Sequence, residues 1–184
     1  MKKILLAVFA ACLIACNNAE KTSPEETKAL TTTKSAINTA GYSPTYSTSF
    51  EMGDNKHAET ILALWKDWDN GNLDPSKNLF ADSVSFYTSD GSLIVGPRDS
   101  AVANAQNFRN MFSDFKTTLH AVFPVKSTDK NEDWVCIWGT EVYTDKKGKV
   151  DSVVLQETWR FDKNGKVNLL YQHSRPAKIQ MVSK

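Results

Sequence analysis

The chain has 184 residues, of which 41% are hydrophobic and 23% are charged, a composition typical of a globular protein with one domain. Its formal net charge of +1 lacks the basic surplus that nucleic-acid-binding proteins carry. The charge balance therefore argues against a nucleic-acid partner and singles out no other class of charged partner.

The chain begins like a secreted protein. Two lysines precede an apolar run from Ile4 to Ala15, which is too short to span a bilayer as a mature helix and is typical of a signal peptide. The residues LIAC at 13–16 resemble the lipobox of bacterial lipoproteins, which implies cleavage before Cys16 and attachment of acyl chains, palmitate among them, to that cysteine. We therefore predict a lipoprotein signal peptide at residues 1–15 and a lipid anchor at Cys16. The alternative is an ordinary signal peptide that happens to contain a cysteine.

This anchor would place the protein on a membrane of the bacterial cell envelope, in a leaflet that the sequence leaves open. Cys12 would leave with the signal peptide and Cys16 would be acylated, so Cys136 would be the one remaining thiol. An intramolecular disulfide is then impossible. Because Cys136 lies between Trp134 and Trp138 in an apolar segment, we interpret it as a small core residue rather than a nucleophile.

The segments on either side of the predicted domain are polar. Residues 16–41 are rich in Thr, Ser, Ala, Asn, Glu and Lys without an apolar period, which predicts a flexible tether. Residues 42–53 place three aromatic residues among small polar ones, and we interpret them as an extended arm that lies on the domain; the alternative is more linker. The domain is predicted to span 54–176, followed by a tail at 177–184.

Helical patterns occur twice. Asp54 is a good N-cap, and apolar residues follow it at the 3,4 spacing of one helical face as far as Trp68. The sequence Asn-Gly-Asn at 70–72 ends this helix, and a short helical turn is predicted at 75–80. A second helix is predicted over 99–112.

The other segments have strand patterns. A short hairpin is predicted from strands at 83–88 and 93–95. Four longer strands are expected at 116–127, 133–144, 150–161 and 166–174. Two similar turns, DKKGK and DKNGK, join the last three strands as consecutive antiparallel hairpins. This order of elements predicts an α+β domain with helices on one face of a bent sheet.

The order of three segments resembles the NTF2-like superfamily, in particular its SnoaL-like domains. The segments are LALWKDWDNGN, LFADSVSFYTSDGSLIVGPRDS and ETWRFDKNGKVNLLY. The resemblance covers about residues 54–176. It implies a cone-shaped α+β barrel in which a curved antiparallel sheet wraps around helices and encloses an apolar pocket. Such domains commonly dimerise through the outer sheet face.

Strand alternation predicts which side chains face the interior. In the segment before the last turn, Leu155, Glu157 and Trp159 share one face, and the polar alternate set indicates that this face points inward. In the last strand the more apolar set contains Tyr171 and His173, which we therefore also expect to point inward. The segment 134–143 has bulky apolar residues on both faces, which leaves its orientation open and predicts a homodimer that covers the outer face.

These inferences together define a candidate pocket. Its predicted residues are Trp65, Phe86, Leu155, Glu157, Trp159, Tyr171 and His173. Glu157 is the candidate catalytic residue, because a carboxylate near Trp159 would have a raised pKa and could act as a general acid or base with a histidine. The alternative places Glu157 at the rim, paired with Arg109, Arg175 or solvent.

Other chemistry finds little support in the sequence. The histidines at 57, 120 and 173 are scattered without ligand spacing, so we predict neither a metal nor a cofactor. Within the superfamily, the ketosteroid isomerases have an aspartate base at a position that Thr88 occupies here, so their mechanism should not transfer.

The function expected first is an envelope lipoprotein whose pocket binds a small apolar or amphipathic ligand. A second hypothesis is an enzyme of proton-transfer or hydration type using Glu157 with a histidine. A third is a non-catalytic structural or partner-binding dimer whose pocket is filled by its own tryptophans.

Overall fold

The computed structural model describes residues 37–177. The predicted signal peptide, Cys16, most of the tether and nearly all of the tail lie outside the described residues. The elements in chain order are β1 (Phe50–Met52), α1 (Asn55–Asn70), the 3-10 turn η1 (Lys77–Leu79), β2 (Phe80–Tyr87), β3 (Leu93–Pro97), α2 (Arg98–Arg109), β4 (Phe112–Ser127), β5 (Asp133–Asp145), β6 (Val150–Phe161) and β7 (Val167–Pro176). Within this part of the chain, no helix is both long and apolar enough to cross a bilayer.

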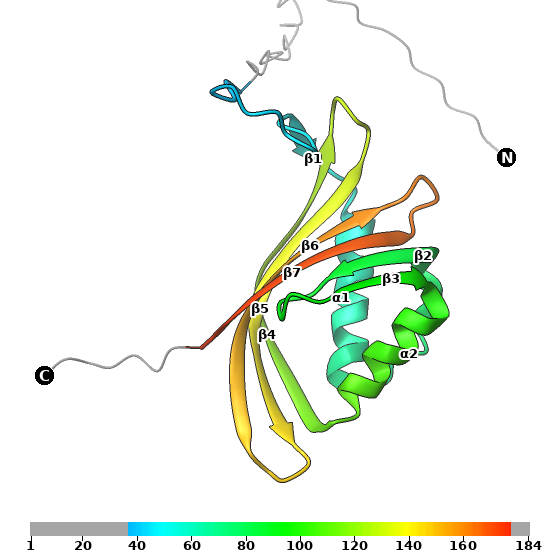
Figure 1. Cartoon of the computed structure of the whole chain (residues 1–184), viewed down its shortest axis with the longest axis vertical. Coiled ribbons are helices and arrows are strands. Elements are labelled where there is room, and N and C mark those ends of the chain that lie inside the picture. The colour runs from blue at the N-terminus through cyan, green and yellow to red at the C-terminus, as the bar shows by residue number, and fades with distance from the viewer. Residues whose placement is uncertain (1–36, 178–184) are drawn as a thin grey trace, which may run out of the picture. The chain divides into compact units, whose positions relative to one another are not determined.

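Between residues 37 and 177, seven strands form one sheet in the order β1-β4-β5-β6-β7-β2-β3. Hairpins connect β4 through β7, so these strands run antiparallel, whereas β2 pairs with β7 in parallel. The sheet is therefore mixed and differs from the expected antiparallel sheet in this pairing. No hairpin joins β2 to β7, so no tight turn dictates their relative direction. Figure 1 shows the long strands bending around α1, with both helices on the concave side, which confirms the predicted α+β arrangement.

Helix α1 begins and ends where the sequence predicts. The Asp54 carboxylate accepts a hydrogen bond from the backbone N–H of Lys56 at 2.9 Å, which caps the first turn. Gly71 ends the helix in the left-handed conformation, with φ of 79°. Ile61 and Leu64 are buried, so this face of α1 packs into the core of the domain. The core residues contributed by the sheet are Phe80, Val84, Phe86, Val135, Ile137, Trp159, Phe161, Val167 and Leu170.

The predicted alternation is confirmed in β6 and wrong in the last part of β7. In β6, Leu155, Glu157 and Trp159 are buried on the concave side, as expected. In β7 the register shifts, because Leu169 pairs with Arg160 while Val167 pairs with Phe161. This β-bulge inserts one residue.

A single inserted residue moves every later side chain to the opposite face. Leu170 and Gln172 consequently point toward the concave side, where they pair across the strands with Trp159 and Glu157. Tyr171 and His173 lie on the outer side of the sheet and not in the predicted pocket.

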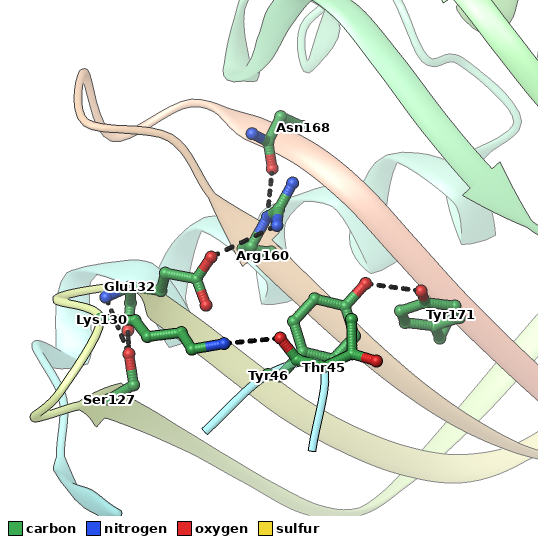
Figure 2. A network of polar contacts seen from close by, with 8 residues as sticks. All are labelled: Thr45, Tyr46, Ser127, Lys130, Glu132, Arg160, Asn168 and Tyr171. Atoms are coloured by element: carbon green, nitrogen blue, oxygen red, sulfur yellow. Dashed lines mark hydrogen bonds and ion pairs between the residues drawn. The ribbon is translucent and has the colours of Figure 1, made fainter. Parts of the chain in front are cut away.

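The segment before α1 supplies the edge strand β1 and places Tyr46 on the outer side of the sheet. Strand β1 pairs with the end of β4, and the Tyr46 ring packs against Trp134 with ring centroids 5.0 Å apart. Figure 2 shows the polar contacts that hold this segment: the Tyr46 and Tyr171 hydroxyls lie 2.7 Å apart, and Lys130 Nζ donates to the carbonyl of Thr45. Trp134 is only 5% exposed, so the chain's own arm covers part of the apolar outer face.

Candidate functional site on the concave face

Glu157 lies at the centre of a hydrogen-bond network on the concave face. Its Oε2 accepts hydrogen bonds from Trp65 Nε1 at 2.7 Å and Trp159 Nε1 at 3.0 Å. Its Oε1 accepts one from Gln172 Nε2 at 2.9 Å. The side chain therefore ties α1 and β7 to the middle of β6, and Glu157 is only 4% exposed. The alternative of a solvated Glu157 at the rim is wrong.

Burial and hydrogen bonding act on the pKa of Glu157 in opposite directions. Removal from water raises the pKa, while the hydrogen bonds from Gln172, Trp65 and Trp159 lower it, and burial dominates. All three contacting groups are donors, so the carboxylate orients two indole rings and an amide. Both oxygens are already engaged, which limits how Glu157 can exchange a proton with a ligand.

Gly139 allows Trp65 to reach this carboxylate. A Cβ atom at position 139 would lie 3.1 Å from the Trp65 ring and 2.5 Å from the carbonyl oxygen of Thr118. Real side chains do not tolerate such approaches, so only glycine fits between β4 and the indole. The Trp65 ring thus packs directly on the backbone of β5 while its Nε1 points to Glu157.

A second buried acid, Glu141, was not among the residues predicted from sequence. It lies on β5 in the same inward set as Ile137 and Gly139, and it pairs with Thr117 of β4 and Val153 of β6. Glu141 is 9% exposed, and within residues 37–177 its carboxyl makes no hydrogen bond. Because β5 has bulky apolar residues on both faces, strand alternation could not show on which face Glu141 lies. Pairing β5 to the more clearly amphipathic β6 would have revealed it.

The surroundings of Glu141 raise its pKa to about 8. Burial is the largest cause, followed by the negative charges of Glu157 and Asp69, while the positive charge of Arg109 acts in the other direction. Glu141 is therefore mostly protonated at neutral pH. A protonated carboxyl can donate a hydrogen bond as well as accept one.

The two helices supply the other charged groups beside Glu141, Asp69 from the C-terminal end of α1 and Arg109 from the end of α2. The Asp69 carboxylate accepts a hydrogen bond from Thr117 Oγ1 at 2.6 Å, directly across from Glu141. Arg109, 5% exposed, donates to the backbone carbonyls of Trp68 at 2.7 Å and Asp69 at 3.0 Å. The guanidinium thereby satisfies carbonyls at the negative end of the α1 dipole.

The structure brings together five of the seven predicted pocket residues. Trp65, Leu155, Glu157 and Trp159 meet on the concave side, and the Phe86 ring packs against Trp159 with centroids 6.3 Å apart. The other two predicted residues do not reach this site. Whether these five residues contact a ligand stays a prediction.

The two outer-face residues have different surroundings. Tyr171 stacks on Tyr87 with ring centroids 4.7 Å apart. His173 is exposed. His120 lies beside Thr140, with its Nε2 3.3 Å from the threonine hydroxyl, and is also exposed. His120 and His173 thus cannot serve as the histidine partner that was expected for Glu157.

A separate polar cleft of about 640 Å³ lies where the β4–β5 and β6–β7 hairpins approach the first turn of α1. Four of its charged groups pair with one another: Arg160 lies 3.4 Å from Glu132, and Lys126 lies 3.6 Å from Asp133. Figure 2 shows the Arg160 guanidinium between Glu132 and Asn168. Among the described residues, no group of three or more His, Cys, Asp or Glu side chains is arranged to hold a metal ion.

Comparison with known proteins gives structural matches only. No protein-family model and no curated protein sequence matches the chain. A protein named as a SnoaL-like polyketide cyclase from Shewanella denitrificans OS-217 aligns with a TM-score of 0.55 at 12% identity, covering 66% of this chain and 92% of its own.

Two further matches are similar in extent. An NTF2-like protein of unknown function from Burkholderia pseudomallei K96243 gives a TM-score of 0.53 at 15% identity, covering 67% of this chain and 92% of its own. An epoxide hydrolase from Mycobacterium tuberculosis gives a TM-score of 0.52 at 11% identity, covering 66% of this chain and 84% of its own. Together with the curved mixed sheet and the two helices on its concave side, these matches show that the described part of the chain has the NTF2-like α+β fold.

Proposed function

We propose that this chain is a lipoprotein of the bacterial envelope whose NTF2-like domain binds a small apolar or amphipathic molecule on the concave face of its sheet. The observation that carries the proposal is that two inner-face residues near the buried acids are exposed, and we call this end of the concave face the opening. Leu119 pairs with Gly139 on the inner side of β4 and is 44% exposed, and Ser174, opposite Leu155, is exposed as well. The helices thus leave one end of an otherwise buried apolar face accessible.

Two tryptophans limit where on the concave face a ligand can bind. Trp65 and Trp159 are fixed by Glu157 and fill the middle of the concave face. This filling is what the hypothesis of a non-catalytic structural module expects. It does not extend to the Leu119 end, and we place the ligand there.

Proton-transfer or hydration chemistry is the second candidate function. The specific observation that favours it is Glu141, whose pKa of about 8 suits a general acid or base at neutral pH. The names of two structural neighbours, a cyclase and an epoxide hydrolase, are consistent with a fold that can accommodate small organic substrates. On this view Glu141 replaces the predicted pair of Glu157 and a histidine.

Native mass spectrometry of the protein isolated from the cells that produce it naturally tests the binding function. We expect a bound mass of a few hundred daltons on the wild-type chain. The Leu119→Lys variant should lose this mass, because a charge would stand at the opening. The matched control is Val142→Lys on the outer face, where Val142 is 40% exposed, and it should retain the mass. A wild-type spectrum without any bound molecule would contradict the proposal.

The lipid anchor has its own test. The wild-type protein should partition into the detergent phase of Triton X-114 and carry the mass of two or three acyl chains, because two chains hold a protein stably on a membrane. The Cys16→Ser variant should remain in the aqueous phase. A wild-type protein cleaved at another position and found in the aqueous phase would refute the lipoprotein assignment.

A homodimer remains part of the proposal. On the outer face Phe123 packs against Trp138, with ring centroids 5.7 Å apart, and Val142, further along the same face of β5, is 40% exposed. The arm covers Trp134, at the other end of β5, so a second copy would have to dock on this remaining surface. Light scattering at tens of micromolar reads the assembly state directly, and a monomer there would rule out the dimer.

A further inference from the structure

Glu141 is only 9% exposed and has no hydrogen-bond partner within residues 37–177, yet its carboxyl oxygens are not among the fully buried unpaired atoms and so keep some access from outside the domain. Burial of a polar group without a hydrogen bond is unfavourable, and most buried polar side-chain groups in proteins have a partner. Thr117 could have been that partner across the strand pair, but its hydroxyl is bonded to Asp69. Arg109 could have neutralised the carboxylate, but its N–H groups are directed to backbone carbonyls of residues 68, 69 and 112.

A second unpaired polar atom lies at the same end of α1. The Nε1 of Trp68 is buried and has no hydrogen-bond partner within residues 37–177. Its ring packs edge-on against Phe115, with centroids 5.4 Å apart, and Phe115 lies one inward position along β4 from Thr117, the cross-strand partner of Glu141. An indole N–H can only donate a hydrogen bond. The Trp68 N–H and the Glu141 carboxyl thus both lack a hydrogen-bond partner within residues 37–177.

We propose that Glu141 is a ligand-binding residue that, in its protonated form, donates a hydrogen bond to a carbonyl or other uncharged acceptor oxygen of the bound molecule. This inference rests on the proposed binding function and defines the ligand further: it is neutral and apolar, and carries an acceptor oxygen at the end that enters the site. Carboxylate ligands are disfavoured, because the Glu157 and Asp69 carboxylates lie near the site. Glu141 itself would repel an anion once it loses its proton.

Several charged or titratable groups face Glu141, and each must be considered in a test that varies pH. They are Glu157 on β6, Asp69 on α1, Arg109 on α2 and Tyr143 on β5. All four are retained when only position 141 is changed. A pH dependence that disappears with a substitution at 141 is therefore assigned to that residue.

The fluorescent probe Prodan suits this test, because it is neutral and apolar and has a single carbonyl oxygen whose hydrogen bonding shifts its emission. We expect wild-type protein to bind Prodan about fivefold to tenfold more tightly at pH 6 than at pH 9.5, as a single hydrogen bond is lost. The Glu141→Gln variant keeps a neutral donor of the same size and should bind equally at both pH values. The Glu141→Leu variant should bind weakly at both, with the blue emission of an unbonded carbonyl.

The carbonyl-free analogue 2-dimethylaminonaphthalene is the matched control probe and should bind all three proteins without pH dependence. Circular dichroism at each pH verifies that the proteins stay folded. If Prodan binds all three proteins with one common pH dependence, the role of Glu141 is refuted while the binding function stands. If neither probe binds the wild type, the proposed function fails and this inference fails with it.

Discussion

Replacing Glu157 by leucine should lower the free energy of unfolding by about 3–5 kcal/mol, whereas replacement by glutamine should cost only about 1 kcal/mol. Leucine removes the acceptor for three donors, the indole N–H groups of Trp65 and Trp159 and the amide of Gln172, and leaves all of them buried without a partner. Glutamine keeps one acceptor oxygen for the two indoles. The Gln172 amide can then rotate and accept from the new NH₂ group.

Urea denaturation followed by tryptophan fluorescence measures this difference, because Trp65 and Trp159 both report on the site. The matched control is Gln156→Leu, the adjacent but exposed position of β6, which should change stability by no more than about 0.5 kcal/mol. A Glu157→Leu variant as stable as the wild type would mean that the network does not organise the fold.

The sequence predicted the centre of this network but only part of its composition. Glu157 could be placed inward because Arg160 and Asp162 mark the opposite set of β6 as the polar face. Trp65 followed from the 3,4 spacing of α1. The alternation that predicts Tyr171 and His173 to point inward would point Gln172 outward, because it assumes an uninterrupted strand and no glycine or proline marks the bulge at Asn168.

Glu141 was missed for a different reason. Alternation assigns faces only where one set is clearly more polar, and in β5 both sets contain large apolar residues. Tyr46 explains why: its ring packs on Trp134, so the outer face of β5 is itself partly buried under the arm. Both cases are decided by which residues pair between neighbouring strands, and alternation within a single strand does not contain that information.

The free energy of unfolding of the wild type should fall as pH rises from about 4.5 to about 8, and Glu141→Gln should reduce this loss. An unfolded glutamate titrates near 4.5, but the folded protein raises the pKa of Glu141 to about 8. Below pH 4.5 the group is protonated in both states and destabilises neither. Between the two values only the unfolded chain loses the proton, so rising pH favours unfolding, and above pH 8 the loss is complete.

The raised pKa of Glu141 lowers the free energy of unfolding by at most about 4–5 kcal/mol at pH 9 and by roughly 3 kcal/mol at pH 7. Glutamine resembles the protonated acid, so the variant should match the wild type near pH 4.5 and exceed its stability at pH 9 by several kcal/mol. Burial also raises the pKa of Glu157, so the free energy of unfolding of both proteins falls with rising pH for this second reason. Because both proteins share that contribution, the difference between their curves of unfolding free energy against pH is assigned to position 141. Urea midpoints at pH 4.5, 6, 7.5 and 9 supply the curves. Parallel curves for the two proteins would show that Glu141 titrates normally in the folded state. That result would remove the physical basis for a neutral hydrogen-bond donor on the concave face.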